Sequence, residues 1–172
     1  QRLIVLVGDI REISRRDEGV TEYKKEQTDR LEVSEECKER LQESADRKEI
    51  KIEVEGSPLV FETTKPILEE VVYNLMDNAI KYNREQGNVT VRIFRKEKQF
   101  GFSVKDTGIG IPLIHQDRIF ERFYRVDKSR SKEIGGTGLG LSIVKHGVSC
   151  LGAQISVDSI PDEGSAFTVT WG

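Results

Sequence analysis

The sequence predicts an α+β fold, a two-layer α/β sandwich with a sheet on one side and helices on the other. In several segments apolar residues recur every three or four positions, which is the pattern of amphipathic helices. Shorter runs alternate apolar and polar residues and follow one another in pairs, which indicates antiparallel hairpins. A chain of 172 residues accommodates one such domain with an appendage, and it can bury a sizeable core without disulfides.

The first helix is predicted over residues 1–18, where five aliphatic residues follow helical spacing: Leu3, Leu6, Val7, Ile10 and Ile13. A single helix of this length is marginal in water, so this one requires a partner helix. Gly19 is expected to end it. Residues 20–32 are polar and are expected to form a connection with one short strand.

The second helix is predicted from Ser34 to about Lys48, because serine is a helix-capping residue and two acids follow it in the first turn. Residues 50–54 alternate aliphatic and charged side chains and predict a half-buried strand. Turn residues at 56–58 close this strand, and residues 59–61 are expected to form a second, short one.

The most regular pattern in the chain lies at residues 65–82, which predict a helix with one continuous apolar stripe. The later segments predict two hairpins and one helix, at residues 88–96 with 100–104, 154–158 with 166–170, and 139–151. Between the hairpins, residues 106–136 are rich in glycine and charge and carry few helix or strand signals beyond one turn near 117–122.

Composition excludes some classes of function. The 27 basic and 30 acidic residues leave a net charge of −3, which favours neither nucleic acid nor an anionic membrane as a partner. Cys37 and Cys150 form no Cys-x-x-Cys pair and are predicted to be buried thiols in a reducing compartment. No apolar run approaches the ~20 residues that span a bilayer. Because the chain begins without Met or a signal peptide, we expect it to be a piece of a longer protein.

The polar edge of the helix at 65–82 carries the first candidate functional residues. Asn74 and Asn78 lie one turn apart on one face, beside Glu70 and Lys81. This face is either an ordinary solvated helix surface or a ligand site. An asparagine oxygen is a suitable ligand for Mg²⁺, and a lysine adds a compact positive charge for phosphates. The residues by themselves leave both interpretations open.

Two glycine-punctuated turns follow this helix, at residues 106–112 and, thirty residues later, at 136–141. Glycine allows the backbone to approach a ligand closely. A helix that begins directly after such a turn presents unpaired amides and a positive dipole end to a phosphate. The pair of turns, next to a helix that bears asparagines, predicts a nucleotide site built from backbone amides.

Four segments, in this order, resemble the motifs of bacterial sensor histidine kinases. Asn74–Tyr82 resembles the N box, Asp106–Pro112 the G1 box, Ile119–Asp127 the F box and Gly136–Leu141 the G2 box. The resemblance covers residues from about 30 to 172. It implies the sandwich shared by histidine kinases, gyrase B, MutL-type repair ATPases and heat-shock chaperone ATPases. It further implies a mixed, mostly antiparallel sheet packed on three helices, and a mobile lid over ATP between the two glycine turns.

The resemblance also implies roles for single residues. Asn78 matches the Mg²⁺ ligand of the family, and Asn74 matches the residue one turn earlier, near the metal and the phosphates. Lys81 and Tyr82 match residues that contact phosphate and flank the nucleotide, and Arg125 matches a phosphate-facing arginine. The catalytic residues are therefore expected to be Asn74, Asn78, Lys81 and Arg125, and the cofactors ATP and Mg²⁺. Arg125 and its neighbour Arg122 also fit the role of simple surface charges.

At the other end of the nucleotide, Asp106 matches the carboxylate that accepts a hydrogen bond from the exocyclic amine of adenine. Gly108, Gly110 and Ile111 belong to its turn, although an isolated aspartate here would equally suit an ordinary turn. The G2 residues match the backbone cradle for phosphate and are Gly136, Thr137, Gly138, Leu139, Gly140 and Leu141. The aromatic residues of the F box, Phe120, Phe123 and Tyr124, are expected to pack in the lid and core.

Neither histidine matches the phosphoacceptor of the family, which lies on the first helix of a dimerisation hairpin. His115 falls within the lid and His146 on the helix after the G2 box. Residues 1–28 are accordingly expected to be the remnant of the second hairpin helix with its linker, and residues 29–172 the catalytic ATP-binding domain. The phosphoacceptor, sensor and membrane segments are expected outside this chain, which would be the cytoplasmic domain of a membrane-bound bacterial sensor.

The predicted function is transfer of the γ-phosphate of Mg-ATP to a histidine on the absent hairpin, for onward transfer to an aspartate of a response regulator. One alternative is a conformational ATPase of the same superfamily, which places a glutamate, as the base that activates water, one turn before the metal ligand. Here that position holds Asn74, whose amide cannot take a proton. The other alternative is a catalytically silent, nucleotide-binding regulatory module.

Two segments depart from the family pattern. Gly152-Ala153 replaces the usual pair of glycines, and Asp162 stands where the usual Gly-x-Gly-Ser run has its first glycine. Both departures are expected to lie away from the nucleotide and to affect only the final hairpin.

Overall fold

The computed structural model of this chain describes residues 24–126 and 138–172. The helix predicted at 1–18, its end at Gly19, and the G2 residues Gly136 and Thr137 lie outside the described residues. The described part contains one five-stranded sheet, one two-stranded sheet and four helices.

The large sheet is mixed and mostly antiparallel, as expected. Its strands are β2 (Lys51–Glu55), β4 (Asn88–Lys96), β5 (Gln99–Asp106), β7 (Gly164–Trp171) and β6 (Gln154–Ile160), in that order across the sheet. Only β2 and β4 pair in parallel, and the connection between them includes the helix α3 (Lys65–Lys81), since a parallel pair requires a long crossover. The other neighbours are antiparallel.

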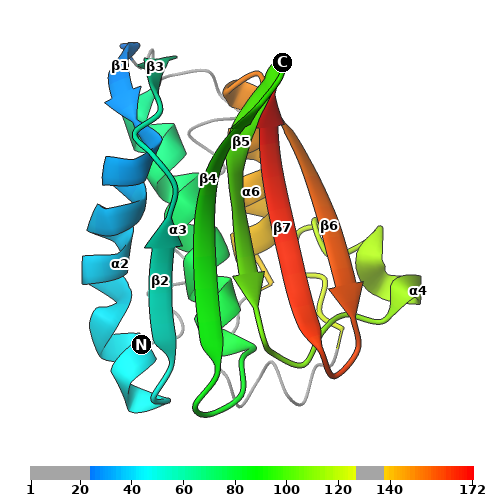
Figure 1. The fold of residues 1–172 in the computed structure, drawn as a ribbon. Helices are drawn as coiled ribbons and strands as arrows, with labels where there is room; N and C mark the ends of the chain where they lie inside the picture. Colours follow the sequence, from blue (N-terminus) through cyan, green and yellow to red (C-terminus); the bar gives the residue numbers. More distant parts are fainter. Residues whose placement is uncertain (1–23, 127–137) are drawn as a thin grey trace.

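Three helices cover one face of this sheet, which confirms the two-layer sandwich (Figure 1). They are α2 (Arg30–Arg47), α3 and α6 (Gly140–Cys150). A fourth, short helix, α4 (Leu113–Gln116), lies beyond the β6 edge of the sheet (Figure 1). The small sheet pairs β1 (Glu26–Asp29) with β3 (Val60–Thr63), and these are the two short strands expected near residues 20–32 and 59–61.

Helix α3 is the central element of the helical layer because its apolar stripe is fully used. Eight of its residues are buried: Ile67, Leu68, Val71, Val72, Leu75, Met76, Ala79 and Ile80. Burying one such large aliphatic side chain stabilises a fold by roughly 1.5–3 kcal/mol. The helix lies between α2 and α6 in the helical layer, and it also contacts β4 and β5 of the sheet. Its polar edge, with Asn74 and Asn78, is therefore carried on a rigid support.

The second helix begins four residues earlier than predicted, at Arg30 instead of Ser34. Asp29 is its cap: Oδ1 accepts hydrogen bonds from the backbone N–H of Leu31 at 3.0 Å and of Leu59 at 2.9 Å. An aspartate that satisfies both the helix and the neighbouring chain outcompetes a serine further along. The Ser34 hydroxyl instead donates to the Arg30 carbonyl within the helix at 2.8 Å.

Two smaller expectations were wrong. Helix α4 lies in a segment that carried no helix signal, because its four residues are too few to show periodicity. Cys37 is a buried free thiol as predicted, but Cys150, the last residue of α6, is exposed.

A lysine holds the end of α3 in place. The Lys48 ammonium donates to the carbonyls of Ile80 at 3.2 Å and Lys81 at 2.7 Å, which are among the last carbonyls of the helix. A positive charge at a helix C-terminus also interacts favourably with the helix dipole. Burial lowers the pKa of Lys48, and the charge of Glu85 opposes that shift. The turn that follows α3, next to Tyr82, is thereby anchored to the end of α2.

Candidate functional site

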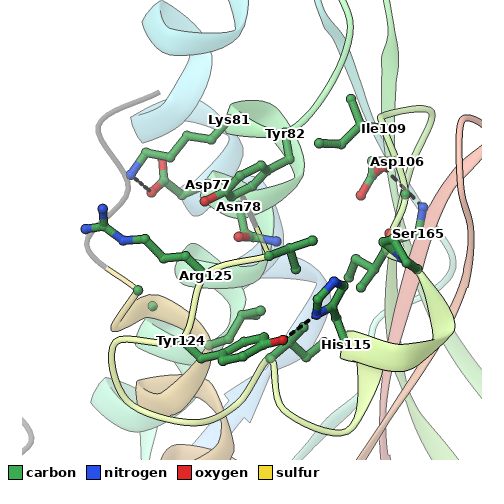
Figure 2. Close-up of a pocket in the computed structure, with 18 of the residues that line it drawn as sticks. Asp77, Asn78, Lys81, Tyr82, Asp106, Ile109, His115, Tyr124, Arg125 and Ser165 are labelled. Atoms are coloured by element: carbon green, nitrogen blue, oxygen red, sulfur yellow. Dashed lines mark hydrogen bonds and ion pairs between the residues drawn. The ribbon is translucent and has the colours of Figure 1, made fainter. Parts of the chain in front are cut away.

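A cavity of about 740 Å³ opens beside α3, and it collects most of the predicted site residues. The predicted residues that line it are Asn74, Asn78, Lys81, Tyr82, Asp106, Gly110, Ile111, Arg125, Gly138, Gly140 and Leu141. Figure 2 shows that side chains from α3, from the end of β5 and from the loop that bears Arg125, among them Asn78, Asp106 and Arg125, surround the cavity. The volume is in the range of pockets that bind small molecules and cofactors, roughly 300–1,000 Å³.

Two predicted residues support the cavity from behind. The Gly108 N–H donates to Asp106 Oδ1 at 2.8 Å, and a side chain at this glycine would collide with the backbone carbonyl of Tyr82. Leu139 is completely buried and forms a small apolar cluster with Ile143. Both residues therefore shape the site without lining it.

The structure adds eleven lining residues that were not predicted as site residues: Tyr73, Asp77, Ile109, Pro112, His115, Ile119, Tyr124, Val126, Pro161, Asp162 and Ser165. Asp77 could have been found, since it lies four residues before Lys81 on the same helix face. Pro161, Asp162 and Ser165 carried no such signal, because they reach the cavity from the β6–β7 turn and the start of β7. The expectation that Asp162 lies away from the site was wrong.

Asp106 is the polar group at one end of the cavity. Its Oδ1 accepts from the backbone N–H of Gly108 at 2.8 Å and of Ser165 at 3.2 Å. Only 6% of the residue is exposed. Burial raises the pKa of the Asp106 carboxyl, and these two hydrogen bonds oppose the rise. Because both bonds use the same oxygen, Oδ2 remains available to accept a hydrogen bond from a ligand.

Asp106 also provides a test of the electrostatics of the site without ligand. A carboxyl whose pKa is raised on folding adds stability only below its unfolded pKa, and that stability is lost as pH rises through the folded pKa. The charged form therefore costs stability at neutral pH. We expect Asp106→Asn to raise the Tm of the ligand-free chain at pH 7, and this gain to shrink as the pH falls through the range in which Asp106 is protonated. Thermal unfolding at several pH values measures it, with the exposed Asp158→Asn as control; a lower Tm at pH 7 would contradict the assignment.

The opposite end of the cavity gathers positive charge and amides. In Figure 2, Lys81 and Arg125 lie on the side away from Asp106. The Lys81 ammonium pairs with Asp77 at 2.8 Å. Burial lowers the pKa of Lys81, but the Asp77 carboxylate, with smaller contributions from Tyr82 and Tyr73, outweighs this, so the pKa is raised and the side chain stays charged.

Helix α6 begins at this end of the cavity. Its first residue, Gly140, and the preceding Gly138 both line the cavity. Among the described residues no side chain caps its N-terminus, and the first amides of a helix, which have no partner within the helix, are suited to hold an anion. Gly138 has a φ of +77°, and a side chain there would collide with the backbone of Phe123. This glycine therefore allows the Arg125 loop to lie directly against the start of α6.

The two asparagines face the cavity in different states. The Asn74 amide nitrogen donates to the Glu70 carbonyl at 2.8 Å, within α3. The Asn74 side-chain oxygen lies near the start of α6, because a Cβ atom placed on Gly140 would be 3.6 Å from that oxygen. In the part of the chain that the structure describes, no hydrogen bond engages the Asn78 side chain, which is half-buried in the cavity wall. Asn78 thus offers a free amide oxygen.

Comparisons with known proteins agree with this geometry. The family model described as Histidine kinase-, DNA gyrase B-, and HSP90-like ATPase matches residues 63–172. The chain is 33% identical to the sensor histidine kinase WalK of Bacillus subtilis over 99% of its own length and 28% of that protein. It is 41% identical to the phosphate regulon sensor protein PhoR of Pseudomonas aeruginosa over 69% of its length and 27% of that protein.

Solved structures give the same result. The mycobacterial sensor histidine kinase MprB superposes with a TM-score of 0.74 at 30% identity, over 86% of this chain and 96% of that one. Full-length ShkA, solved in complex with AMPPNP, superposes with a TM-score of 0.84 at 27% identity, over 98% of this chain and 35% of that one.

The fold, the cavity and these matches define a class, the ATP-binding catalytic domains of histidine kinases. The chain belongs to the histidine kinase-, DNA gyrase B- and HSP90-like ATPase family. It spans about a quarter of the length of the curated relatives that it matches. No helix among the described residues is both long and apolar enough to cross a membrane. The boundary predicted between residues 28 and 29 stays a prediction.

Proposed function

We propose that this chain transfers the γ-phosphate of Mg-ATP to a histidine on a dimerisation hairpin outside the chain, from which it passes to an aspartate of a response regulator. Asp106 would accept a hydrogen bond from the amine of adenine. Lys81, Arg125 and the amides at the start of α6 would hold the phosphates at the other end. The same proposal makes it the cytoplasmic catalytic part of a membrane-bound bacterial sensor.

The observation that carries the proposal is the absence of a usable carboxylate base in the described part of the cavity. Its carboxylates there are Asp77, Asp106 and Asp162. Asp77 is paired with Lys81, and Asp106 is buried at the far end. Asp162 belongs to the β6–β7 turn, and its side chain is 92% exposed. Asn74 occupies the helix position from which a glutamate would activate water, and an amide cannot take that proton.

Transfer to an external imidazole avoids this need. A neutral histidine is nucleophilic without a strong base, whereas water must lose a proton to attack a phosphorus atom. A cavity that holds the nucleotide, and whose described carboxylates are not placed to activate water, favours transfer over hydrolysis. Because the family also includes HSP90-like ATPases, ATP hydrolysis is the second candidate function. A direct measurement distinguishes phosphate transfer from hydrolysis.

The donor set around Asn78 also fits Mg²⁺. No group of three or more His, Cys, Asp or Glu side chains among the described residues could form a cage for a metal. Mg²⁺ commonly uses few protein ligands and shares itself with waters and substrate phosphates. The free amide oxygen of Asn78 would hold the ion, which when bound would neutralise charge on the phosphates. Lys81 and Arg125 would orient the same phosphates by their fixed positive charges.

The proposal is tested with γ-labelled ATP. We expect the chain alone to bind ATP, to turn it over very slowly and not to label itself, because neither His115 nor His146 lies on an acceptor hairpin. Label should appear when a hairpin that bears the acceptor histidine is supplied as a separate fragment, and it should disappear when that histidine is replaced by Ala. Brisk hydrolysis that the hairpin does not change would favour the ATPase. Binding without transfer or hydrolysis would favour a silent module.

A further inference from the structure

A histidine that the proposed chemistry does not use lies in the wall of the cavity. His115 Nδ1 and the Tyr124 hydroxyl form a hydrogen bond, drawn as a dashed line in Figure 2. Both residues line the cavity. Their rings are 5.9 Å apart between centroids. The bond joins α4 to the loop that bears Tyr124, and the next residue of this loop is Arg125.

The α4 side of this link is fixed to the sheet. The Gln116 amide donates to the Ile111 carbonyl at 2.9 Å and to the Ser159 carbonyl of β6 at 3.2 Å. The Ile111 N–H in turn donates to the Ser159 hydroxyl at 2.8 Å. His115, the neighbour of Gln116, is therefore presented from an element with several attachments to the β6 edge.

The loop side is held at the residue before Tyr124 and at the Tyr124 ring itself. The Phe123 N–H donates to the Gly138 carbonyl at 2.9 Å, next to the start of α6. The guanidinium carbon of Arg118 lies 4.6 Å from the centroid of the Tyr124 ring, and Arg118 is paired with Glu121 at 3.1 Å. The hydrogen bond with His115 adds a direct attachment of the Tyr124 hydroxyl to α4.

Arg125 itself has no such restraint. Among the described residues no hydrogen bond or ion pair holds its side chain, although it is half-buried at the cavity. Holding a free arginine in one rotamer costs conformational entropy. The position of its backbone therefore decides how easily the guanidinium reaches a phosphate.

We propose that His115 is a positioning residue, which through Tyr124 holds Arg125 at the phosphate end of the cavity. The inference rests on the proposed function only for the ligand, a nucleotide whose phosphates lie at that end. His115 needs neither to touch the nucleotide nor to change its protonation state. The bond to Tyr124 preorganises the arginine before the phosphates arrive.

The test compares two ligands that share adenine and differ in phosphates, a non-hydrolysable ATP analogue and AMP. We expect His115→Ala and Tyr124→Phe each to weaken binding of the ATP analogue by about fivefold, the scale of one net hydrogen bond, and to change AMP binding by less than about twofold. The double variant should be no weaker than the weaker single variant. Calorimetry, with displacement for AMP, measures all of these. His146→Ala, a histidine of α6 that does not line the cavity, is the matched control.

A second comparison isolates the route through Arg125. In an Arg125→Ala background, His115→Ala should cause no further loss of affinity, since the group that it positions is gone. An equal loss for AMP and the ATP analogue, or a full additional loss in the Arg125→Ala background, would overturn the proposal. A His115→Ala variant with parental affinities would overturn it too. These experiments measure binding alone, so a failure of phosphate transfer to a hairpin would not contradict the positioning role of His115. A parent chain that binds no nucleotide would contradict both this role and the proposed function.

Discussion

Asn78→Ala is expected to reduce Mg²⁺-dependent phosphate transfer to the hairpin at least 100-fold, which corresponds to about 2.7 kcal/mol of transition-state stabilisation. A metal ion that neutralises phosphate charge contributes several kcal/mol to such a transition state, and Asn78 is the one side-chain amide of α3 at the cavity for which the described structure shows no hydrogen bond at all. Asn74 is partly committed to the Glu70 carbonyl.

Nucleotide binding should weaken much less in this variant. Asp106, Lys81 and the amides at the start of α6 are unchanged, so the adenine and most of the phosphate contacts remain. Fold should also survive, because Asn78 is outside the buried stripe of α3 and alanine is the better helix former. Single-turnover transfer, calorimetric ATP affinity and Tm separate the three effects.

Asn88→Ala is the matched control for this variant. It removes an exposed amide at the start of β4 that does not line the cavity, and should leave transfer at the parental rate. If Asn78→Ala transferred phosphate at nearly the parental rate over a range of Mg²⁺ concentrations, Asn78 would not be the metal ligand.

The second large effect is expected at Asp106. Asp106→Asn keeps Oδ1 for the N–H groups of Gly108 and Ser165 but replaces Oδ2 by an amide donor. A donor that faces the amine of adenine leaves a buried polar group unmatched, and we expect ATP affinity to fall by about 1–3 kcal/mol, roughly 5–150-fold. Guanine presents a carbonyl in place of that amine, so the preference for ATP over GTP should shrink or reverse in the variant.

Calorimetric titration of parent and variant with ATP and GTP measures this change. Asp158→Asn, which replaces an exposed carboxylate on β6, should alter neither affinity. Equal affinity of the parent for ATP and GTP would show that Asp106 does not select the base. Together with a raised ligand-free Tm, the loss of affinity would show that Asp106 is kept for binding at the expense of stability.

Several elements could be predicted because their signals are local. The apolar stripe of α3 follows a period that only a helix satisfies, so helix 65–82 and the face that bears Asn74 and Asn78 followed from spacing. The alternation of apolar and polar residues predicted the strands β2, β4 and β5 equally well. The family could be predicted because the order and separation of its four motifs along the chain are specific, whereas the roles of the single motif residues stay predictions.

Other features depended on where distant segments meet. Alternation left open which face of β4 turns inward, and the buried face proved to be that of Val89, Val91 and Ile93 because the helical layer covers it. The start of α2 moved to Arg30 because Asp29 bonds at once to the helix and to Leu59. Neither fact can be read from a window of neighbouring residues.

By itself, the sequence predicted most of the helices and strands and the family to which the chain belongs, because periodicity and motif spacing are properties of residue order. The tertiary structure decided how that site is completed. Ser165 reaches Asp106 across 59 positions, and His115 meets Tyr124 across a loop with no periodic signal. Such contacts arise only when the sheet and the helices have packed, since the burial of the apolar stripes, and not local preference, brings these polar groups together.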